Sequence, residues 1–142
     1  MRVNNVGVWT DGATRVVFDA RGVAAADQII IRKDNLNGQF DFFYRSAAGA
    51  LLTISSLAHA ETGWVSVGIT FSVAANQLIA YFNGVPVAAP MIGVVAWTTA
   101  FNLALIGAAT IVPVNVWHGW LAHVSYFNYA LTPAQMLDMG TI

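Results

Sequence analysis

The sequence predicts an all-β fold, an antiparallel β-sandwich that ends in one short helix. Three observations favour this fold class. Short runs of β-branched and aromatic residues recur along the chain, residues 63–73 alternate between large apolar and small side chains, and Asn83-Gly84 lies between two apolar arms. Asn-Gly is preferred in two-residue type I′ hairpins because both central residues need a positive φ. The chain has no fixed repeat and no linker-like composition, so one domain covering residues 1–142 is expected.

About eight strands are expected in order along the chain. The opening stretch supplies the first strand, and turn residues bound the next three at residues 14–20, 27–33 and 38–45. Further strands are expected at residues 49–57, 63–73, 77–87 and 102–108. Because alternate residues of a strand face opposite sides, residues 63–73 predict a half-buried strand. Its apolar face comprises Val65, Val67, Ile69, Phe71 and Val73.

The apolar period changes only after Leu131. Thr132 suits the N-cap of a helix, Pro133 suits the first helical position, and Gln135 is the reciprocal partner of a capping box. A short C-terminal helix is therefore predicted.

Charge is scarce and unevenly placed. Charged residues make up 9% of the chain, hydrophobic residues make up 57%, and the net charge is −1 with His neutral. All basic residues lie within the first 45 positions. Without a basic cluster the chain lacks the electrostatic footprint for nucleic acid or for an anionic membrane, so neither partner is expected. The absence of cysteine excludes disulfides and thiolate metal sites.

The apolar stretch at residues 84–113 does not have the pattern of a membrane-spanning segment. Pro86, Pro90 and Pro113 interrupt it, and no Lys or Arg flanks it. Two buried strands joined by a loop fit it better, so no membrane insertion is expected. The first twelve residues lack the apolar run of a signal peptide, so a virion or an extracellular surface would be reached by another route.

Four motifs follow one another in the second half of the chain. Trp64 opens the alternating strand, LIAYFNG ends at Gly84, LALIG ends at Gly107, and WHGWLAHVSYFNYALTPAQM leads into the helix. In this order the motifs resemble the laminin-G-like jelly roll of the concanavalin A-like lectin and glucanase superfamily. The resemblance covers residues 64–139 and implies a jelly-roll sandwich. That family usually has one or two more N-terminal strands than MRVNNVGVWTDGA can supply, so an uncovered sheet edge is expected.

The resemblance raises the possibility of calcium. Calcium-binding members of the family use clustered carboxylates and Asn side chains, because a hard cation needs several oxygen ligands. Where the family often has IDEV, this chain has Leu-Ala-His-Val at residues 121–124. The remaining weak calcium candidates are Asp34, Asn35, Asn37 and Asp41. Turn formation explains these four residues better, so calcium is not favoured and no cofactor is expected.

Catalysis is disfavoured by the shortage of carboxylates. The glucanase branch of the family hydrolyses glycosidic bonds with two nearby carboxylates, whereas Glu61 is the single glutamate here. His59 and Glu61 could suggest an acid/base pair, but a turn before a strand is expected to keep both solvated. No Ser-His-Asp arrangement or phosphate-binding glycine loop is recognised. The sequence therefore predicts that the protein is not an enzyme.

The stretch from residue 115 to 124 combines two histidines with two tryptophans. On a strand, His118 and His123 leave opposite faces and cannot share a metal ion, so His118 is expected at the rim and His123 in or beside the core. Trp117 and Trp120 also leave opposite faces. One is expected to fill the core and the other to be exposed or at an interface.

Two non-catalytic functions remain open. The first is a structural or adhesion module of a larger assembly, most simply a phage virion component such as a capsid decoration or tail-fibre part, whose partners are other protein subunits. The alternative is a carbohydrate-binding module of a bacterial surface or secreted protein. The charge-poor half favours the assembly, because monomers rarely expose large apolar patches. The candidate interface or ligand residues are Trp9, Trp97, Phe101, Ile111, Trp117 and His118.

Overall fold

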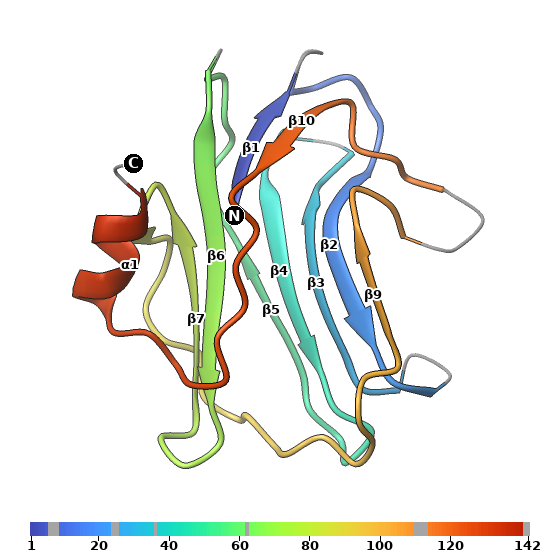
Figure 1. The fold of residues 1–142 in the computed structure, drawn as a ribbon, viewed down its shortest axis with the longest axis vertical. Helices are drawn as coiled ribbons and strands as arrows, with labels where there is room; N and C mark the ends of the chain where they lie inside the picture. Colours follow the sequence, from blue (N-terminus) through green and yellow to red (C-terminus); the bar gives the residue numbers. More distant parts are fainter. Residues whose placement is uncertain (6–8, 24–25, 36, 62, 110–113, 141–142) are drawn as a thin grey trace.

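The computed structural model describes residues 1–5, 9–23, 26–35, 37–61, 63–109 and 114–140. These residues form a sandwich of two antiparallel sheets, with one helix on the outer side of the first sheet (Figure 1). The predicted fold class, an antiparallel β-sandwich with a short C-terminal helix, is confirmed.

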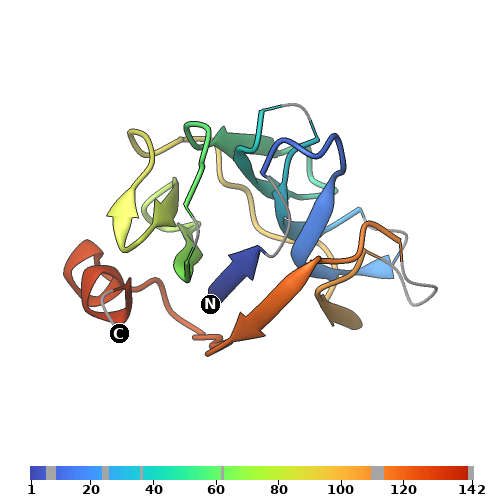
Figure 2. The same ribbon diagram turned by 90° about the horizontal axis from the view of Figure 1, so that it is seen from above.

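The first sheet joins the two ends of the chain. Its strand order is β10-β1-β6-β7-β8, and all neighbouring strands are antiparallel. The bounds are β1 Arg2–Asn5, β6 Val65–Ser72, β7 Gln77–Phe82, β8 Val85–Pro86 and β10 Gly119–Ala122. Seen from above, β1 lies between β6 and β10 (Figure 2).

The second sheet has the order β5-β4-β3-β2-β9 and is also antiparallel. Its strands are β2 Arg15–Arg21, β3 Gln28–Lys33, β4 Phe40–Arg45, β5 Leu51–Ser55 and β9 Leu103–Ile106. Alternating residues such as Ile29, Ile31, Phe40 and Phe42 face the first sheet and form the core with Val3, Val65 and Val67.

The hairpin and helix follow the sequence signals closely. Asn83 and Gly84 have φ values of 49° and 76°, as a type I′ turn requires. Helix α1, Pro133–Gly140, begins with the predicted capping box: Thr132 N–H donates to Gln135 Oε1 at 2.9 Å, and Gln135 N–H donates to Thr132 Oγ1 at 3.3 Å. The helix packs on the hairpin so closely that a Cβ on Gly84 would lie 2.6 Å from Leu137 Cα.

Burial differs from expectation at two places. Ser66 and Thr70 are buried on the outer face of β6, where a solvated face was expected, and the Met136 side chain of α1 lies against the neighbouring Gly68. The charge-poor connection holds no buried strand in its described part: β8 is exposed, and β9 is a half-buried edge strand. No helix in the described part of the chain has the length and apolar character needed to cross a membrane.

Candidate functional site

Two of the predicted interface tryptophans are core residues. Trp9 and Trp117 are each only 6% exposed, and their ring centroids lie 6.4 Å apart, with Phe40 against both. Trp9 Nε1–H donates to the Glu61 carbonyl at 2.7 Å, and Trp117 Nε1–H donates to the Asn4 carbonyl at 3.1 Å. Burial and satisfied hydrogen bonds remove both side chains from the surface, which corrects their assignment as surface contacts.

The two histidines behave differently from expectation. His118 is exposed, which agrees with a rim position, but His123 is exposed as well and does not pack in the core. His123 has a φ of 51°, which is the left-handed region, and β10 ends at the residue before it. The strand expected here is therefore only four residues long. Trp120 is 66% exposed, so one tryptophan of the pair is in the core and the other is outside, as predicted.

Trp97 and Phe101 lie in an aromatic cluster at the far end of the sandwich. The Trp97 ring lies 4.1 Å from Phe101, 4.8 Å from Phe71 and 5.3 Å from Tyr44, centroid to centroid. Its Nε1–H donates to the Arg45 carbonyl at 3.1 Å. Ile111, the remaining apolar candidate, lies outside the described residues.

Asp27 holds the loop that carries Trp97. This buried carboxylate accepts hydrogen bonds from the N–H of Ala47 at 2.8 Å and from both the N–H and the hydroxyl of Thr98 and Thr99. Burial raises the pKa of Asp27, but these hydrogen bonds outweigh burial and hold the pKa well below its usual range. Burial, with the Asp27 charge, also raises the pKa of Tyr44 to about 12.

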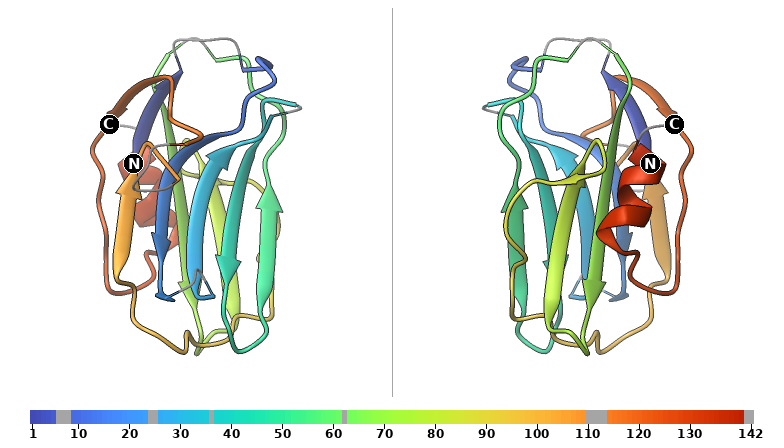
Figure 3. Two further views of the ribbon diagram at one scale, coloured as in Figure 1. Left: turned by 90° about the vertical axis from the view of Figure 1, so that its right-hand side faces the viewer. Right: turned by 90° about the vertical axis from the view of Figure 1, so that its left-hand side faces the viewer.

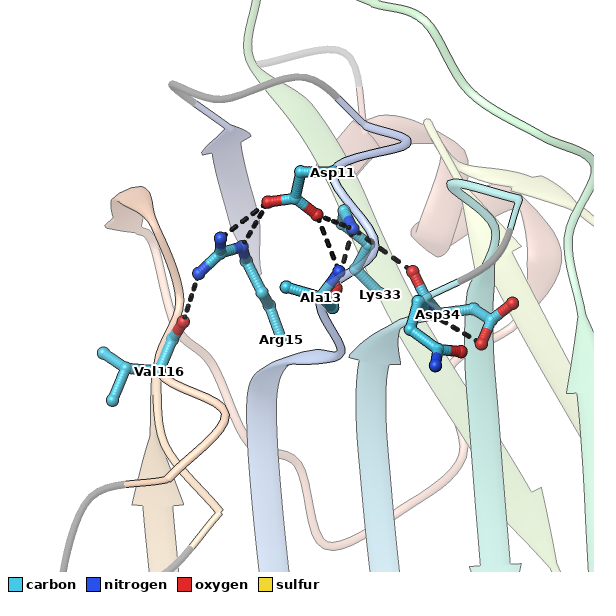
Figure 4. Close-up of polar contacts among 7 residues, drawn as sticks. Asp11, Ala13, Arg15, Lys33, Asp34 and Val116 are labelled. Atoms are coloured by element: carbon cyan, nitrogen blue, oxygen red, sulfur yellow. Dashed lines mark hydrogen bonds and ion pairs between the residues drawn. The ribbon is translucent and has the colours of Figure 1, made fainter.

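A buried lysine anchors the opposite end of the second sheet (Figure 4). Lys33 is fully buried, and its ammonium donates to Asp11 Oδ1 at 2.8 Å, to the Ala13 carbonyl at 2.8 Å and to the Asp34 carbonyl at 3.2 Å. Arg15 binds the other Asp11 oxygen at 2.6 Å and the Val116 carbonyl at 3.2 Å. Burial raises the pKa of Asp11, but the hydrogen bonds from Lys33 and Arg15 have the larger combined effect and hold the pKa below its usual range. These contacts saturate the ammonium, so the cluster ties loops together and offers no free cation to a ligand.

Both carboxylates among the calcium candidates, Asp34 and Asp41, have partners within the protein. Asp41 is held by Arg32 at 3.2 Å and by the Ser55 hydroxyl at 2.7 Å. Asp34 accepts the Asn35 N–H at 2.7 Å, which is a local turn contact. Asn37 is exposed. Within the described ranges, no three His, Cys, Asp or Glu residues lie together as a metal site requires.

His59 is packed rather than solvated, which corrects the expectation for the turn before β6. Its ring stacks on Phe82 at 3.6 Å, its Nε2 lies 2.9 Å from Ser56 Oγ, and its Nδ1 lies 3.1 Å from Glu61 Oε1. The order Ser-His-Glu resembles a hydrolytic triad. However, Ser56 is buried and its hydroxyl is bonded to the Phe40 N–H and the Leu57 carbonyl, so it does not face a substrate.

Exposed aromatic and polar side chains lie together on the outer face of β10, β1 and β6. Val3, Val65 and Leu121 pack into the core, so the neighbouring Asn4, Trp64 and Trp120 face outward. Asn4 pairs with Trp120, and because Val3 pairs with Val65, Asn4 also lies opposite Trp64. The backbone positions of the two tryptophans therefore lie on either side of Asn4, two strand spacings or roughly 10 Å apart. Trp120 is 66% exposed and Trp64 is 42% exposed.

Arg2 completes this surface, which we call the tryptophan platform and define as Arg2, Asn4, Trp64 and Trp120. The Arg2 Cζ lies 5.8 Å from the centroid of the Trp64 ring. Arg2 Nε is buried without a hydrogen-bond partner, and Arg2 forms no ion pair with any described residue. Sequence reasoning missed the platform, although the Val3, Val65 and Leu121 pattern could have revealed which neighbours share the outer face.

A second feature is a groove of about 300 Å³ between β6 and the segment that follows β10. It is lined from inside the sandwich by Phe18, Ile31, Trp97 and Phe101, from β6 by residues 67–71, and from the other side by residues 124–131. Met136 of α1 closes its outer end. We call this the β6 groove.

The chain was compared with known protein families and with solved structures. The family described as the Concanavalin A-like lectin/glucanases superfamily, Laminin_G_3, matches residues 4–136. No curated protein matches the chain. The CBM40 of the Ruminococcus gnavus IT-sialidase superimposes with a TM-score of 0.77 and 10% identity, over 99% of this chain and 79% of that one. The same CBM40 bound to α2,3-sialyllactose gives a TM-score of 0.77 and 11% identity, over 98% and 79%. The four ordered motifs, the sandwich topology and the family match over nearly the whole chain agree: the chain belongs to the concanavalin A-like lectin/glucanases superfamily.

Proposed function

We propose that the protein is a non-catalytic carbohydrate-binding module that holds a glycan on the tryptophan platform. The observation that carries this proposal is the pair of exposed indoles on either side of Asn4. Aromatic faces stack on the apolar faces of sugar rings, and an amide between them can both donate to and accept from sugar hydroxyls. The structurally similar CBM40, which was solved with bound α2,3-sialyllactose, supports the hypothesis that this protein binds a carbohydrate.

The platform favours a glycan that carries a carboxylate. Arg2 has no anionic partner among the described residues, and a guanidinium can bind a carboxylate through two parallel hydrogen bonds. The adjacent Trp64 face limits the water around Arg2, which strengthens this contact. An acidic sugar placed over Arg2 and Trp64, with a second ring on Trp120, uses all four residues of the platform.

Binding to a glycan array followed by titration with α2,3-sialyllactose tests the proposal. Trp120→Ala and Trp64→Ala should each weaken binding by about tenfold or more, as loss of a contact worth about 1.4 kcal/mol does. Arg2→Ala should weaken binding of acidic glycans selectively, and Arg2→Lys should restore part of it. Tyr126→Ala and Arg45→Ala, which remove an exposed aromatic and an exposed cation elsewhere, are the matched controls. Full affinity in both tryptophan variants contradicts the proposal.

We also propose that the module does not hydrolyse glycans. Ser56 is buried and bonded to the Phe40 N–H, and His59 is bonded to both Ser56 and Glu61, so internal contacts occupy these side chains. A glycan-binding role also fits a surface-associated or extracellular location. Incubation with a panel of polysaccharides should release no sugar, and turnover that disappears in Glu61→Gln would overturn this point.

A role in a larger assembly is the second candidate function, and a specific feature favours it. The chain exposes large apolar side chains such as Leu57 and Ile92, and the β6 groove leaves part of the sandwich interior open. A virion is one such assembly, but the relatives found favour carbohydrate binding, which therefore takes first place here. Sedimentation over a wide concentration range separates the two, because an assembly module should associate without any glycan.

A further inference from the structure

We propose that the β6 groove accepts an extended, apolar β-strand from another polypeptide chain, which completes the first sheet in line with β1. This proposal concerns a different surface from the tryptophan platform and does not rest on glycan binding.

The first argument is an unfinished ladder. Strand β6 runs from Val65 to Ser72, but β1 pairs with it only from Val65 to Val67: Val67 N–H donates to the Met1 carbonyl at 2.9 Å, and the Met1 amine donates to the Val67 carbonyl at 3.2 Å. Polar groups of alternate residues point to the same side of a strand. The N–H and C=O groups of Ile69 and Phe71 therefore point toward the groove, and no described strand pairs with them there.

The second argument is that the gap lies within the sheet itself. The groove is lined by Ile69 and Phe71, which face the interior, and also by Gly68 and Thr70, which face α1. A depression on one face of an intact sheet would not be lined by both faces of one strand. Its volume of about 300 Å³ is about twice that of a cavity left by removing a single large side chain.

The third argument is the opposite wall. Strand β10 pairs with β1 as far as Ala122 opposite Arg2, and the chain then runs alongside the sandwich to α1 (Figure 3). Residues 124–129 line the groove without forming a strand of their own. A strand placed below β1 would thus have backbone on both sides, from Gly68–Ser72 and from residues 124–129, which β-augmentation exploits.

These features define the occupant. About five residues, antiparallel to β6, would span Gly68 to Ser72 at roughly 3.3 Å per residue. The residues opposite Ile69 and Phe71 would enter the interior beside Phe18 and Ile31 and should be apolar. The side chains of the lining carry no formal charge, which disfavours a charged strand, and the Met1 amine at the end of β1 is the one formal charge in the lining. A second folded copy is a poor donor, because each strand in the described part of the chain is already paired on at least one edge.

The test uses a capped synthetic peptide of about seven residues that alternates Thr and Val, which covers the gap of about five residues with one residue to spare at each end. We expect saturable binding by fluorescence anisotropy, together with slower hydrogen exchange at the Ile69 and Phe71 amides. A control peptide with Pro at alternate positions keeps apolar side chains but loses backbone donors, and it should not bind. The proposal is overturned if those two amides exchange slowly without peptide, or if both peptides bind equally.

Variants distinguish peptide binding in the β6 groove from glycan binding and from self-association. Val124→Asp places a charge on the groove wall at a partly exposed position and should weaken peptide binding about tenfold or more. Val114→Asp, at a similarly exposed position outside the groove, should leave peptide binding unchanged. Trp120→Ala should leave peptide binding unchanged, so failure of the glycan proposal is distinguishable. If the Ile69 and Phe71 amides become protected by self-association or by glycan instead of peptide, the assigned occupant is wrong.

Discussion

At the scale of single residues, buried charged side chains hold the loops at the ends of the second sheet in place. Lys33 is fully buried, and its ammonium meets one carboxylate and two carbonyls. A buried ammonium that loses its carboxylate is strongly destabilising, whereas removal of both partners is far less costly. The contact energy of this pair is therefore best measured by a double-mutant comparison.

We predict that Asp11→Ala lowers the free energy of unfolding by about 3 kcal/mol, because Lys33 is left buried without its carboxylate. The double variant Asp11→Ala/Lys33→Met should recover a substantial part of that loss. Urea denaturation measures both quantities. Equal stability of the single variant and the unaltered protein would show that the Lys33 contact contributes nothing.

The acid limb of the stability curve depends on Asp11 and Asp27. Both carboxyls have a pKa in the folded protein below the unfolded value of about 3.9. Their contribution is therefore fully present above that value and is lost as the pH falls through the folded pKa. We predict a melting temperature that falls steeply below about pH 4, and a shallower fall in Asp27→Asn. An acid limb of unchanged slope in that variant would contradict this assignment.

At the scale of elements, local chemistry predicted the hairpin and helix well. Asn83-Gly84 and Thr132 to Gln135 act through contacts within a few residues, so the sequence pattern suffices. The burial of Ser66 and Thr70 could not be predicted in the same way, because it depends on where α1 packs. The same holds for His59, whose stacking on Phe82 brings together two separate parts of the chain.

A pair of glycine variants measures how much α1 contributes. Gly84 and Gly12 have similar φ values, +76° and +71°, but a Cβ at Gly84 would meet Leu137 whereas a Cβ at Gly12 would meet nothing within 4 Å. Gly12→Ala should therefore report backbone strain alone, of about 1 kcal/mol. We predict that Gly84→Ala costs more than Gly12→Ala and exposes α1 to proteolysis. Identical losses of stability in both variants would contradict the packing of α1 on the hairpin.

At the scale of the whole molecule, the fold class followed from periodicity and motif order, but the surfaces did not. The sequence places Trp9 and Trp117 no differently from Trp64 and Trp120, and only the pairing of β1 with β6 and β10 separates core indoles from exposed ones. The sequence predicted a sheet edge without a partner strand. In the structure, the groove lies beside β6, an inner strand of the first sheet.

Calcium should be dispensable for stability. Asp41 is held by Arg32 and Ser55, and Asp34 accepts a hydrogen bond from the Asn35 N–H, so these oxygens already have partners. We predict the same melting temperature, within about 2 °C, in excess chelator and in millimolar calcium, because a ligand that binds only the folded state must raise stability. A large increase with calcium would reveal a cation site.

The central claim is that the tryptophan platform holds a glycan, and the five tryptophans of the chain provide their own test. Titration with α2,3-sialyllactose, or with the best glycan from an array, can be followed by the indole N–H signals in nuclear magnetic resonance spectra. We predict shifts of the Trp64 and Trp120 signals, with the bonded indoles of Trp9, Trp97 and Trp117 unchanged. Saturable binding that shifts Trp97 and leaves Trp64 and Trp120 in place would contradict the claim.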